Sequence, residues 1–316
     1  MSKNDGWLYG FRNLAWMEDN ELRTQLPYVF RLMAALFRVQ RKLSQPYVRL
    51  GSQQFKLAAV LNDLIRTGPI RFEVDGVIAY LASTDPRMLA VPGELRNLLS
   101  GQSLIAKILK PNDTFVDVGA NHGAFSNAAS KRVGREGLVV AFEPQRRFAA
   151  LVEKALAENA FSPYRVFVAG CGSRNERLTF FIPDGSSSGR ASLHECYVDQ
   201  ECADRVEIDV VTLDSALQDI ELRGHLFIKI DVEGAEYDVL QGARKTIARH
   251  RPTLMLEINH DSMQAANTTL EDYQELLGEL GYARFRKLSD LSVTFPLSDL
   301  FISPKTDIII EYHAAH

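Results

Sequence analysis

The feature that most constrains the fold is a regular alternation of short apolar runs with helical patterns, which begins near Leu98. Five nearly continuous apolar runs are predicted to be strands: Thr114–Val118, Leu138–Phe142, Arg165–Ala169, Leu226–Ile230 and Thr253–Ile258. Helical spacing separates several of them, over Gly123–Arg132, Gln145–Asn159 and Ala235–Arg249. Apolar strands of this kind are typical of a parallel sheet that helices cover on both faces. The alternation therefore predicts a doubly wound α/β fold.

Three further segments have strand patterns. Thr306–Tyr312 is predicted to be the last strand, and Arg177–Ile182 and Val206–Val211 are predicted to be extra strands inserted before the fourth core strand. The first hundred residues differ, because Leu22–Leu43 and Gln53–Arg66 have helical spacing. We therefore divide the chain into an N-terminal helical cap with an accessory hairpin over residues 1–100 and a main domain over residues 101–316.

The accessory hairpin is predicted over Arg71–Ala82, with its turn at Asp75-Gly76. An Asp-Gly pair between apolar strands favours a type I′ turn, which needs a positive φ at both central residues. The preceding segment, Leu22–Asn62, is basic and contains an amphipathic helical pattern. Its helices are candidates for contacts between copies of the chain in a homo-oligomer.

The composition excludes several classes of protein. Hydrophobic residues make up 46% and charged residues 24% of the 316 residues, with a formal net charge of −4, which is typical of a globular protein without a nucleic-acid partner. No uncharged apolar run approaches the roughly 18 residues of a membrane span. The first residues, MSKNDGW, have no apolar signal-peptide core. The three cysteines form no C-x-x-C pair, so we expect a reducing, cytoplasmic location.

A glycine-containing loop follows the first predicted core strand, in the run Val116–Gly123. Gly119 permits a sharp turn, and Gly123 permits close approach of a helix or a ligand. Such a loop at the carboxyl end of a parallel strand is the usual binding crevice of these folds. Its spacing is G-x-x-x-G rather than the G-x-G-x-x-G of dinucleotide folds. The Asp117 carboxylate disfavours a pyrophosphate and favours a cationic, phosphate-free nucleoside such as S-adenosylmethionine.

The second core strand ends in Phe142-Glu143-Pro144, and Glu143 lies 24 residues after Gly119. An acid at this point can accept hydrogen bonds from both hydroxyls of a ribose. After the third strand, the small residues Ala169–Gly172 leave room for a flat adenine. His122, inside the glycine loop, is expected to line the pocket without a chemical role.

These motifs together resemble the FkbM family of methyltransferases. The similarity is carried by Asp117–Gly123, by Phe142-Glu143-Pro144 and above all by the run KIDVEGAE at Lys229–Glu236, and it covers roughly Leu109 to Asp261. It implies a class I methyltransferase fold, with a seven-stranded sheet whose last strand is antiparallel. It also implies S-adenosylmethionine as the methyl donor and, usually, a hydroxyl oxygen as the acceptor.

The resemblance also implies roles for individual residues: Asp117, Gly119, Asn121 and Gly123 would line the methionine end of the cofactor, and Glu143 would hold the ribose. Together with the residues that adjoin these motifs, the full set of candidates for cofactor binding is Asp117, Gly119, Ala120, Asn121, Gly123, Glu143, Pro144, Gly170 and Asp231.

The catalytic end is expected where the fourth and fifth core strands finish, because these strands deliver Asp231 and Glu257 to the same edge of the sheet. Asp231, Glu257 and His260 are the catalytic candidates, and a carboxylate or imidazole among them could take the acceptor's proton. In the alternative, Asp231, Glu257 and Asn259 hold a divalent cation such as Mg²⁺, for which oxygen ligands are suited.

Three functions fit these patterns. The first is O-methylation of a small hydroxylated metabolite, such as a sugar, a glycoside or a polyketide-like product. The second is a non-catalytic protein that binds a cofactor or a partner on the same fold. The third is an NAD-type oxidoreductase, against which the loop spacing and the acid at Asp117 both argue.

Overall fold

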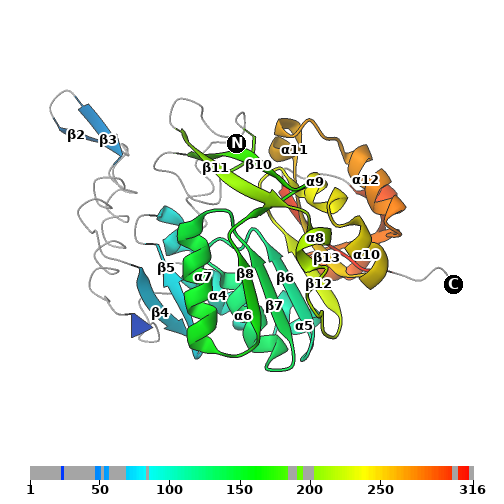
Figure 1. Ribbon diagram of the computed structural model, residues 1–316, viewed down its shortest axis with the longest axis horizontal. Helices are drawn as coiled ribbons and strands as arrows, with labels where there is room; N and C mark the ends of the chain where they lie inside the picture. The colour runs from blue at the N-terminus through cyan, green and yellow to red at the C-terminus, as the bar shows by residue number, and fades with distance from the viewer. Residues whose placement is uncertain are drawn as a thin grey trace.

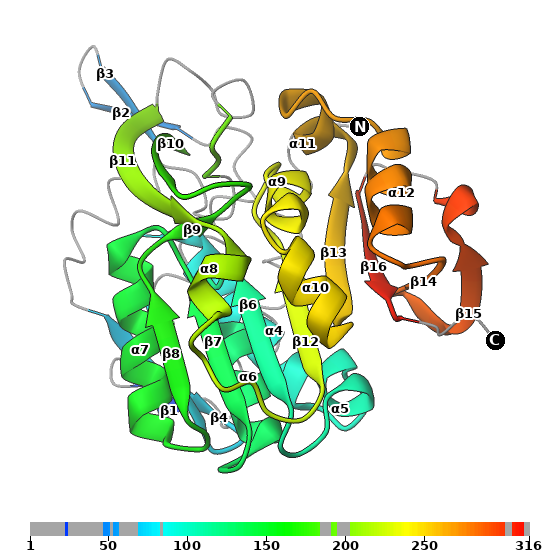
Figure 2. The ribbon, with the colours of Figure 1, turned by 45° about the vertical axis from the view of Figure 1, so that its right-hand side comes forward.

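A mixed sheet of eight strands forms the centre of the computed structural model, which describes residues 23–24, 47–50, 53–56, 69–82, 85–183, 191–194, 203–300 and 305–312. Its strand order is β15-β14-β16-β13-β12-β6-β7-β8 (Figure 2), and Figure 1 labels the strands from β13 to β8 in the same order. The strands are β6 (Thr114–Val118), β7 (Leu138–Phe142), β8 (Tyr164–Phe167), β12 (Leu226–Ile230), β13 (Thr253–Asn259), β14 (Arg284–Lys287), β15 (Asp290–Pro296) and β16 (Lys305–Ile310).

The five predicted core strands are confirmed, and they pair in parallel as β13-β12-β6-β7-β8. The predicted last strand is β16, which runs antiparallel between β13 and β14. This is the class I methyltransferase fold, but the expected number of seven strands is wrong. The eighth strand, β15, folds back antiparallel on β14 at the edge of the sheet. Most of β15 is exposed, so it lacks the apolar signal that revealed the inner strands.

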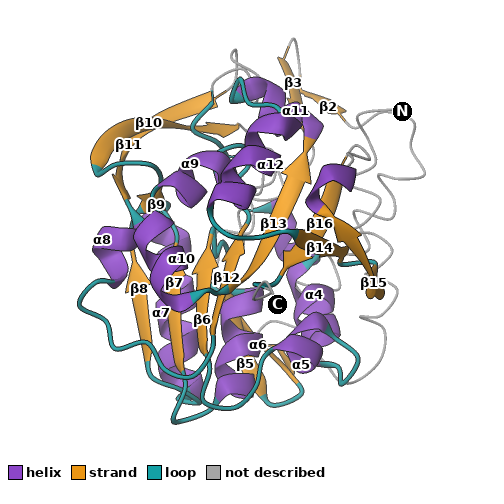
Figure 3. Ribbon diagram, turned by 90° about the vertical axis from the view of Figure 1, so that its right-hand side faces the viewer, coloured by secondary structure: helices purple, strands orange, loops and turns teal. Residues whose placement is uncertain are grey.

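Helices cover both faces of the sheet (Figure 3). Alternate strand residues point to opposite faces: Phe115 packs with one set of helices, and Val116 with the other. The first set is α4 (Val91–Leu99), α5 (Leu104–Ile108), α6 (Ala124–Val133) and α7 (Arg146–Asn159). The second set is α8 (Leu213–Leu217), α9 (Glu236–Gln241), α10 (Arg244–His250) and α12 (Leu270–Glu279). The buried core thus has two layers, one on each face.

The helix predicted over Ala235–Arg249 is two helices, α9 and α10, which are divided at Gly242. A Cβ on Gly242 would lie 2.0 Å from the Gly172 carbonyl oxygen, so the chain passes there directly against another backbone. The short α11 (His260–Ala265) follows β13, and two 3-10 turns, η2 (Pro86–Leu89) and η6 (Leu297–Asp299), complete the helical elements of the described residues.

The predicted inserted strands are confirmed and form a separate small sheet. It contains β9 (Gly170–Cys171), β10 (Glu176–Pro183) and β11 (Ala203–Val211), in the order β10-β11-β9. Its apolar side chains, including Phe180 and Ile208, form a cluster with Ala191. This small sheet stands over the carboxyl ends of the central strands (Figure 2).

The accessory hairpin is confirmed as β4 (Ile70–Val74) and β5 (Val77–Leu81). Asp75 and Gly76 have φ values of 50° and 72°, as a type I′ turn requires. The inner side chains of the hairpin join the same hydrophobic core as α4 and α6, and β5 lies beside α7 (Figure 1).

The helices predicted over Leu22–Leu43 and Gln53–Arg66 are wrong where the structure describes them. Arg23–Thr24 is strand β1, which pairs with β4, and Gln53–Lys56 is strand β3, which pairs with β2 (Tyr47–Leu50). Pairing with a partner strand overrides helical spacing here. The remainder of both segments, and with it the proposed oligomer contact, lies outside the described residues.

No helix in the described ranges has the length and apolar character to cross a membrane.

Candidate functional site

A cavity of about 680 Å³ opens at the carboxyl ends of β6, β7, β12 and β13. The chain continues from β6 outward to β7 and β8 and then returns to β12 on the other side of β6. Ligands bind at such a switch point in doubly wound folds, and the volume is typical of a small-molecule site. Of the predicted cofactor residues, all except Asp117 and Gly123 line this cavity.

The loop after β6 is held close to the end of β12. A Cβ on Gly119 would lie 2.0 Å from the backbone oxygen of Asp231, and Gly119 has a φ of +82°. Gly123 has a φ of +76° and is the N-cap of α6, and a Cβ at this position would lie 3.0 Å from Val152 Cγ2. The two glycines therefore let the loop turn sharply between the sheet and the helix, with Ala120, Asn121 and His122 on the cavity side.

The Glu143 carboxylate lies in the cavity wall and is only 4% exposed. Its two oxygens accept hydrogen bonds from the backbone N–H groups of Asn121, at 2.8 Å, and Gln145, at 2.9 Å. Burial raises the pKa of Glu143 to about 7, against the lowering effect of these two hydrogen bonds. Its orientation is thus fixed by the backbone on both sides, and Pro144 and Gly170 line the cavity next to it.

The Asp117 carboxylate does not face the cavity, contrary to the expectation that it would meet a cationic ligand directly. It is fully buried, accepts a hydrogen bond from Ser126 Oγ at 2.6 Å and pairs with Lys229 Nζ at 3.1 Å. Lys229 does line the cavity, and its Nζ lies 3.5 Å from Asp231 Oδ2. Burial lowers the pKa of Lys229, but Asp117 and Asp231 outweigh it, so that the net shift is upward.

His122 lines the cavity, and its ring packs on Phe148 with 4.6 Å between ring centroids. Nδ1 lies 2.6 Å from Asn121 Oδ1, while Nε2 is buried and has no hydrogen-bond partner among the described residues. Burial lowers the pKa of His122 to about 4. The imidazole is therefore neutral near pH 7, with a hydrogen on Nδ1 and an acceptor lone pair on Nε2.

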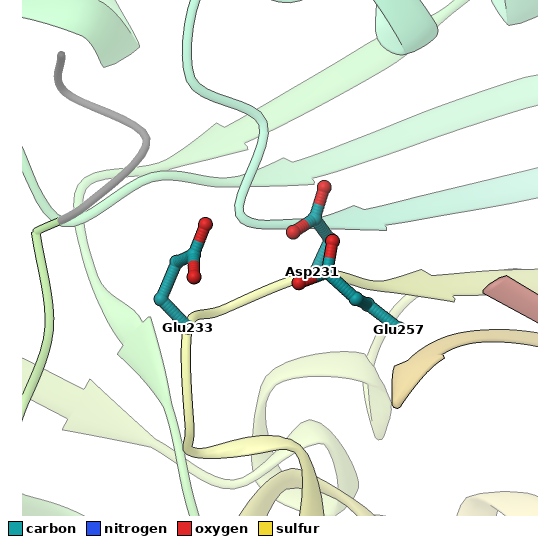
Figure 4. Close-up of side chains that lie close together, drawn as sticks. All are labelled: Asp231, Glu233 and Glu257. Atoms are coloured by element: carbon teal, nitrogen blue, oxygen red, sulfur yellow. The ribbon is translucent and has the colours of Figure 1, made fainter. Parts of the chain in front are cut away.

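Three carboxylates meet at the other end of the cavity (Figure 4). Asp231 follows β12, Glu233 lies on the next loop, and Glu257 belongs to β13. One oxygen from each lies within 4.8 Å of the others. Figure 4 shows Asp231 and Glu257 close together, with Glu233 across from them. The predicted convergence of Asp231 and Glu257 is therefore present, and Glu233 joins them.

Glu257 is buried, and its Oε2 forms an ion pair with Lys305 Nζ. Its Oε1 is also buried and has no hydrogen-bond partner in the part of the chain that the structure describes. Burial and the nearby Asp231 raise the pKa of Glu257 to about 7. For Asp231, burial acts to raise the pKa, but the ammonium groups of Lys229 and Lys305 lower it by more.

The loop between β12 and α9 is shaped by Glu236. This buried carboxylate accepts hydrogen bonds from the backbone N–H groups of Val232, at 3.1 Å, and Gly234, at 3.0 Å. Ser192 Oγ donates a hydrogen bond to the Glu233 carbonyl at 2.7 Å. The Glu233 backbone has a φ of 53°. These bonds fix the loop that carries Glu233, so Glu236 has a positioning role.

Two other predicted catalytic or metal-binding residues lie elsewhere. His260 is exposed at the start of α11, and Asn259 caps this helix by accepting a hydrogen bond from the Asp261 N–H at 3.0 Å. Neither is among the described residues that line the cavity. The physical reason is that β13 continues past Glu257 to Asn259, so the chain has left the cavity before α11 begins.

Several cavity residues were missed in the sequence. Lys229 gives a signal, because it is the one charged residue in the strand LFIKI. Lys305 and Asp307 come from β16, whose register opposite Glu257 is a tertiary property. Arg87 and Glu94 come from η2 and α4, outside the region of family resemblance. Among the described residues of the cavity, six carboxylates outnumber three basic side chains: Glu94, Glu143, Asp231, Glu233, Glu257 and Asp307 against Arg87, Lys229 and Lys305.

A family model described as the methyltransferase FkbM domain matches residues 117–286, which is more than half of the chain. No curated protein matches. Among solved structures, methyltransferase FkbM from Methylobacillus flagellatus KT is 18% identical, with a TM-score of 0.40. This similarity covers 71% of the present chain but only 53% of that protein.

Two further structures show a more distant similarity. The S-adenosylmethionine-dependent O-methyltransferase from Thermotoga maritima is 12% identical, with a TM-score of 0.37, over 85% of this chain and 86% of that one. M. jannaschii TYW2, solved in complex with AdoMet, is 10% identical, with a TM-score of 0.39, over 78% of this chain and 85% of that one. Because all three TM-scores are below 0.5, membership of the FkbM family is shown by the match over residues 117–286.

Proposed function

We propose that this chain, which belongs to the FkbM methyltransferase family, transfers a methyl group from S-adenosylmethionine to a hydroxyl oxygen of a small acceptor. The observation that carries this proposal is a single cavity with two chemically different ends. One end is a glycine loop beside the anchored Glu143, and the other is a group of carboxylates. The two ends suit a nucleoside donor and a hydroxylated acceptor, respectively.

The donor end fits S-adenosylmethionine in three ways. Glu143 has oxygen lone pairs left for the ribose hydroxyls after it has bound Asn121 and Gln145. Small residues at Ala169 and Gly170 leave a flat space beside it. A neutral His122, whose Nε2 has no hydrogen-bond partner among the described residues, lines the same cavity. When bound, the cofactor supplies an activated methyl group on its sulfonium.

The acceptor end suits a hydroxyl group. The acceptor oxygen must lose its proton during or just after it attacks the methyl carbon, and Asp231 and Glu257 have carboxylate oxygens at this end of the cavity. Much of the rate can come from alignment of the two reactants, which is worth up to about 7–11 kcal/mol. Arg87 and Glu94 form the wall nearest the N-terminal region. They are candidates for selecting a polar metabolite such as a sugar, a glycoside or a polyketide-like product.

The test begins with calorimetric titration of the full chain with S-adenosylhomocysteine and, separately, with NAD. We expect saturable binding of the first and none of the second. Glu143→Gln should weaken the binding of S-adenosylhomocysteine by about tenfold or more, because hydrogen bonds to a charged group are worth about 1.5–3 kcal/mol. Binding of NAD alone would overturn the proposal.

Transfer of a labelled methyl group to a panel of small alcohols and to their amine analogues then tests the reaction. We expect labelled ethers from the alcohols. Cofactor binding with no transfer to any acceptor would favour the non-catalytic alternative, and transfer to the amines alone would contradict a hydroxyl acceptor.

A further inference from the structure

We propose that Asp231, Glu233 and Glu257 form a binding site for a divalent metal cation at the acceptor end of the cavity. The cation would hold the acceptor oxygen, a role that rests on the proposed function. The binding of the cation itself requires neither cofactor nor acceptor. The two ideas can therefore be tested separately.

The spacing of the three carboxylates fits one cation. One oxygen of each lies within 4.8 Å of the others. Calcium binds oxygen at about 2.3–2.6 Å, so two ligands on opposite sides of it are at most about 4.6–5.2 Å apart. Magnesium, at about 2.0–2.1 Å, needs opposite ligands no more than about 4.0–4.2 Å apart. Oxygen ligands of this kind suit both cations and also manganese.

An independent observation points to a ligand at the same place. Glu257 lines the cavity and is 6% exposed, and its buried Oε1 has no hydrogen-bond partner among the described residues. Lys305 occupies only the other oxygen, Oε2. A buried carboxylate oxygen that has lost its hydrogen bonds to water and gained no other partner destabilises the folded state. A bound cation would satisfy this oxygen.

The electrostatics of the cavity favour a positively charged ligand. Among the described residues that line the cavity, there are twice as many carboxylates as basic side chains. The nearest two cations are already engaged, Lys229 with Asp117 and Asp231, and Lys305 with Glu257. A phosphorylated acceptor would meet an excess of like charge here. A divalent cation would offset this charge and leave a site for neutral oxygen ligands.

The cation site also defines a class of acceptor. Three protein oxygens would fill half of the six positions of an octahedral cation such as Mg²⁺ and leave the others to water or to the acceptor. An acceptor with two adjacent oxygens, such as the vicinal diol of a sugar, could chelate in these positions. The cation would lower the pKa of the bound hydroxyl, so that its proton would pass to a carboxylate oxygen that does not bind the cation, or to water. The oxygen–methyl bond would form as the sulfur–methyl bond of the donor breaks, with S-adenosylhomocysteine as the leaving group.

The first experiment titrates the full chain with Mn²⁺ in the absence of cofactor and acceptor, and follows the unbound ion by electron paramagnetic resonance. We expect one saturable site, from which Mg²⁺ or Ca²⁺ displaces the Mn²⁺. Glu233→Gln and Glu257→Gln should each weaken Mn²⁺ binding by about tenfold or more, since affinity follows the number of charged ligands. Glu94→Gln is the matched control, because Glu94 lines the same cavity outside the cluster, and it should keep wild-type affinity.

Failure of Mn²⁺ to bind at millimolar concentration, or equal binding by wild type and both cluster variants, would overturn the site. If Glu257→Gln does not fold, the decision rests on Glu233→Gln, whose side chain is less buried. Titration of the same samples with S-adenosylhomocysteine separates the two proposals. A protein that binds S-adenosylhomocysteine but not Mn²⁺ would contradict only the proposed cation site. A protein that binds Mn²⁺ but not S-adenosylhomocysteine would support the cation site and contradict S-adenosylmethionine as the methyl donor.

Discussion

Lys229 is a buried cation between two carboxylates, and its partner Asp117 is fully buried. Removing the lysine should leave an uncompensated charge in the core. We expect Lys229→Met to lower the free energy of unfolding by about 3–5 kcal/mol. Urea denaturation followed by circular dichroism measures this loss. The double variant with Asp117→Asn should recover part of it, and a double variant that is no more stable than Lys229→Met would show that the pair is not coupled.

Glu143 links stability to pH. Its pKa in the folded protein, about 7, exceeds the ordinary value of 4.5 because of burial. An acid whose pKa is higher in the folded than in the unfolded state takes up protons on folding. Ionisation of Glu143 therefore leaves the free energy of unfolding almost unchanged below about pH 4.5 and lowers it by the full amount above pH 7. From pH 4.5 to pH 8, the unfolding free energy of Glu143→Gln should therefore rise relative to wild type by about 3 kcal/mol. Urea denaturation at both pH values tests this, and a constant difference would contradict it.

At the scale of elements, the loop between β6 and α6 depends on close packing at Gly119 against Asp231. Gly119→Ala should lower the free energy of unfolding by about 3 kcal/mol or more, through backbone strain and a steric clash together. Gly76→Ala is the matched control, since Gly76 also has a positive φ but a Cβ added there would meet no described atom within 4 Å. It should cost only about 1–2 kcal/mol of strain. Equal losses in the two variants, measured by urea denaturation, would rule out the clash.

The accuracy of the sequence predictions differed between elements for physical reasons. The inner strands are buried on both faces, so that their apolar runs fix them almost to the residue: β6, β7 and β12 begin and end where predicted. The edge strand β15 is mostly exposed and has no such run. The break between α9 and α10 depends on contact with Gly172, which helical spacing cannot reveal.

The residues of the candidate site could also be predicted only where the local sequence determines their position. Glycines and acids that end strands β6, β7, β12 and β13 were identified because parallel strands bring their carboxyl ends to one edge. Lys305 and Asp307 were not, because they depend on how β16 pairs with β13. The burial of Asp117 could not be foreseen either, since its partner Lys229 lies on a strand that is distant in the sequence.

At the scale of the whole molecule, a chain of amides connects the accessory hairpin to the loop between β6 and α6. Asn159 bonds to both backbone groups of Ile78, at 2.8 and 2.7 Å, and donates to Asn127 Oδ1 at 3.1 Å. Asn127 in turn donates to the Gly123 carbonyl at 2.8 Å. The hairpin also shares the core of the first helical layer.

We therefore expect amides of the hairpin, such as those of Phe72 and Ala79, to exchange hydrogen in the same cooperative unit as β6. Asn159→Ala removes three hydrogen bonds and should cost about 2–4 kcal/mol, with faster exchange in the hairpin than in β6. Native-state hydrogen exchange by mass spectrometry gives both results. Independent opening of the hairpin in the wild-type protein would instead agree with a domain boundary near residue 100.

The position of β16 has a consequence for synthesis. This strand follows every other strand of the central sheet in the chain, yet it lies inside the sheet, between β13 and β14. A ribosome must therefore release residues 305–310 before β13 gains its second neighbour and before Glu257 meets Lys305. Until then the nascent chain displays an open strand edge beside an unpaired acid, a surface to which a chaperone could bind.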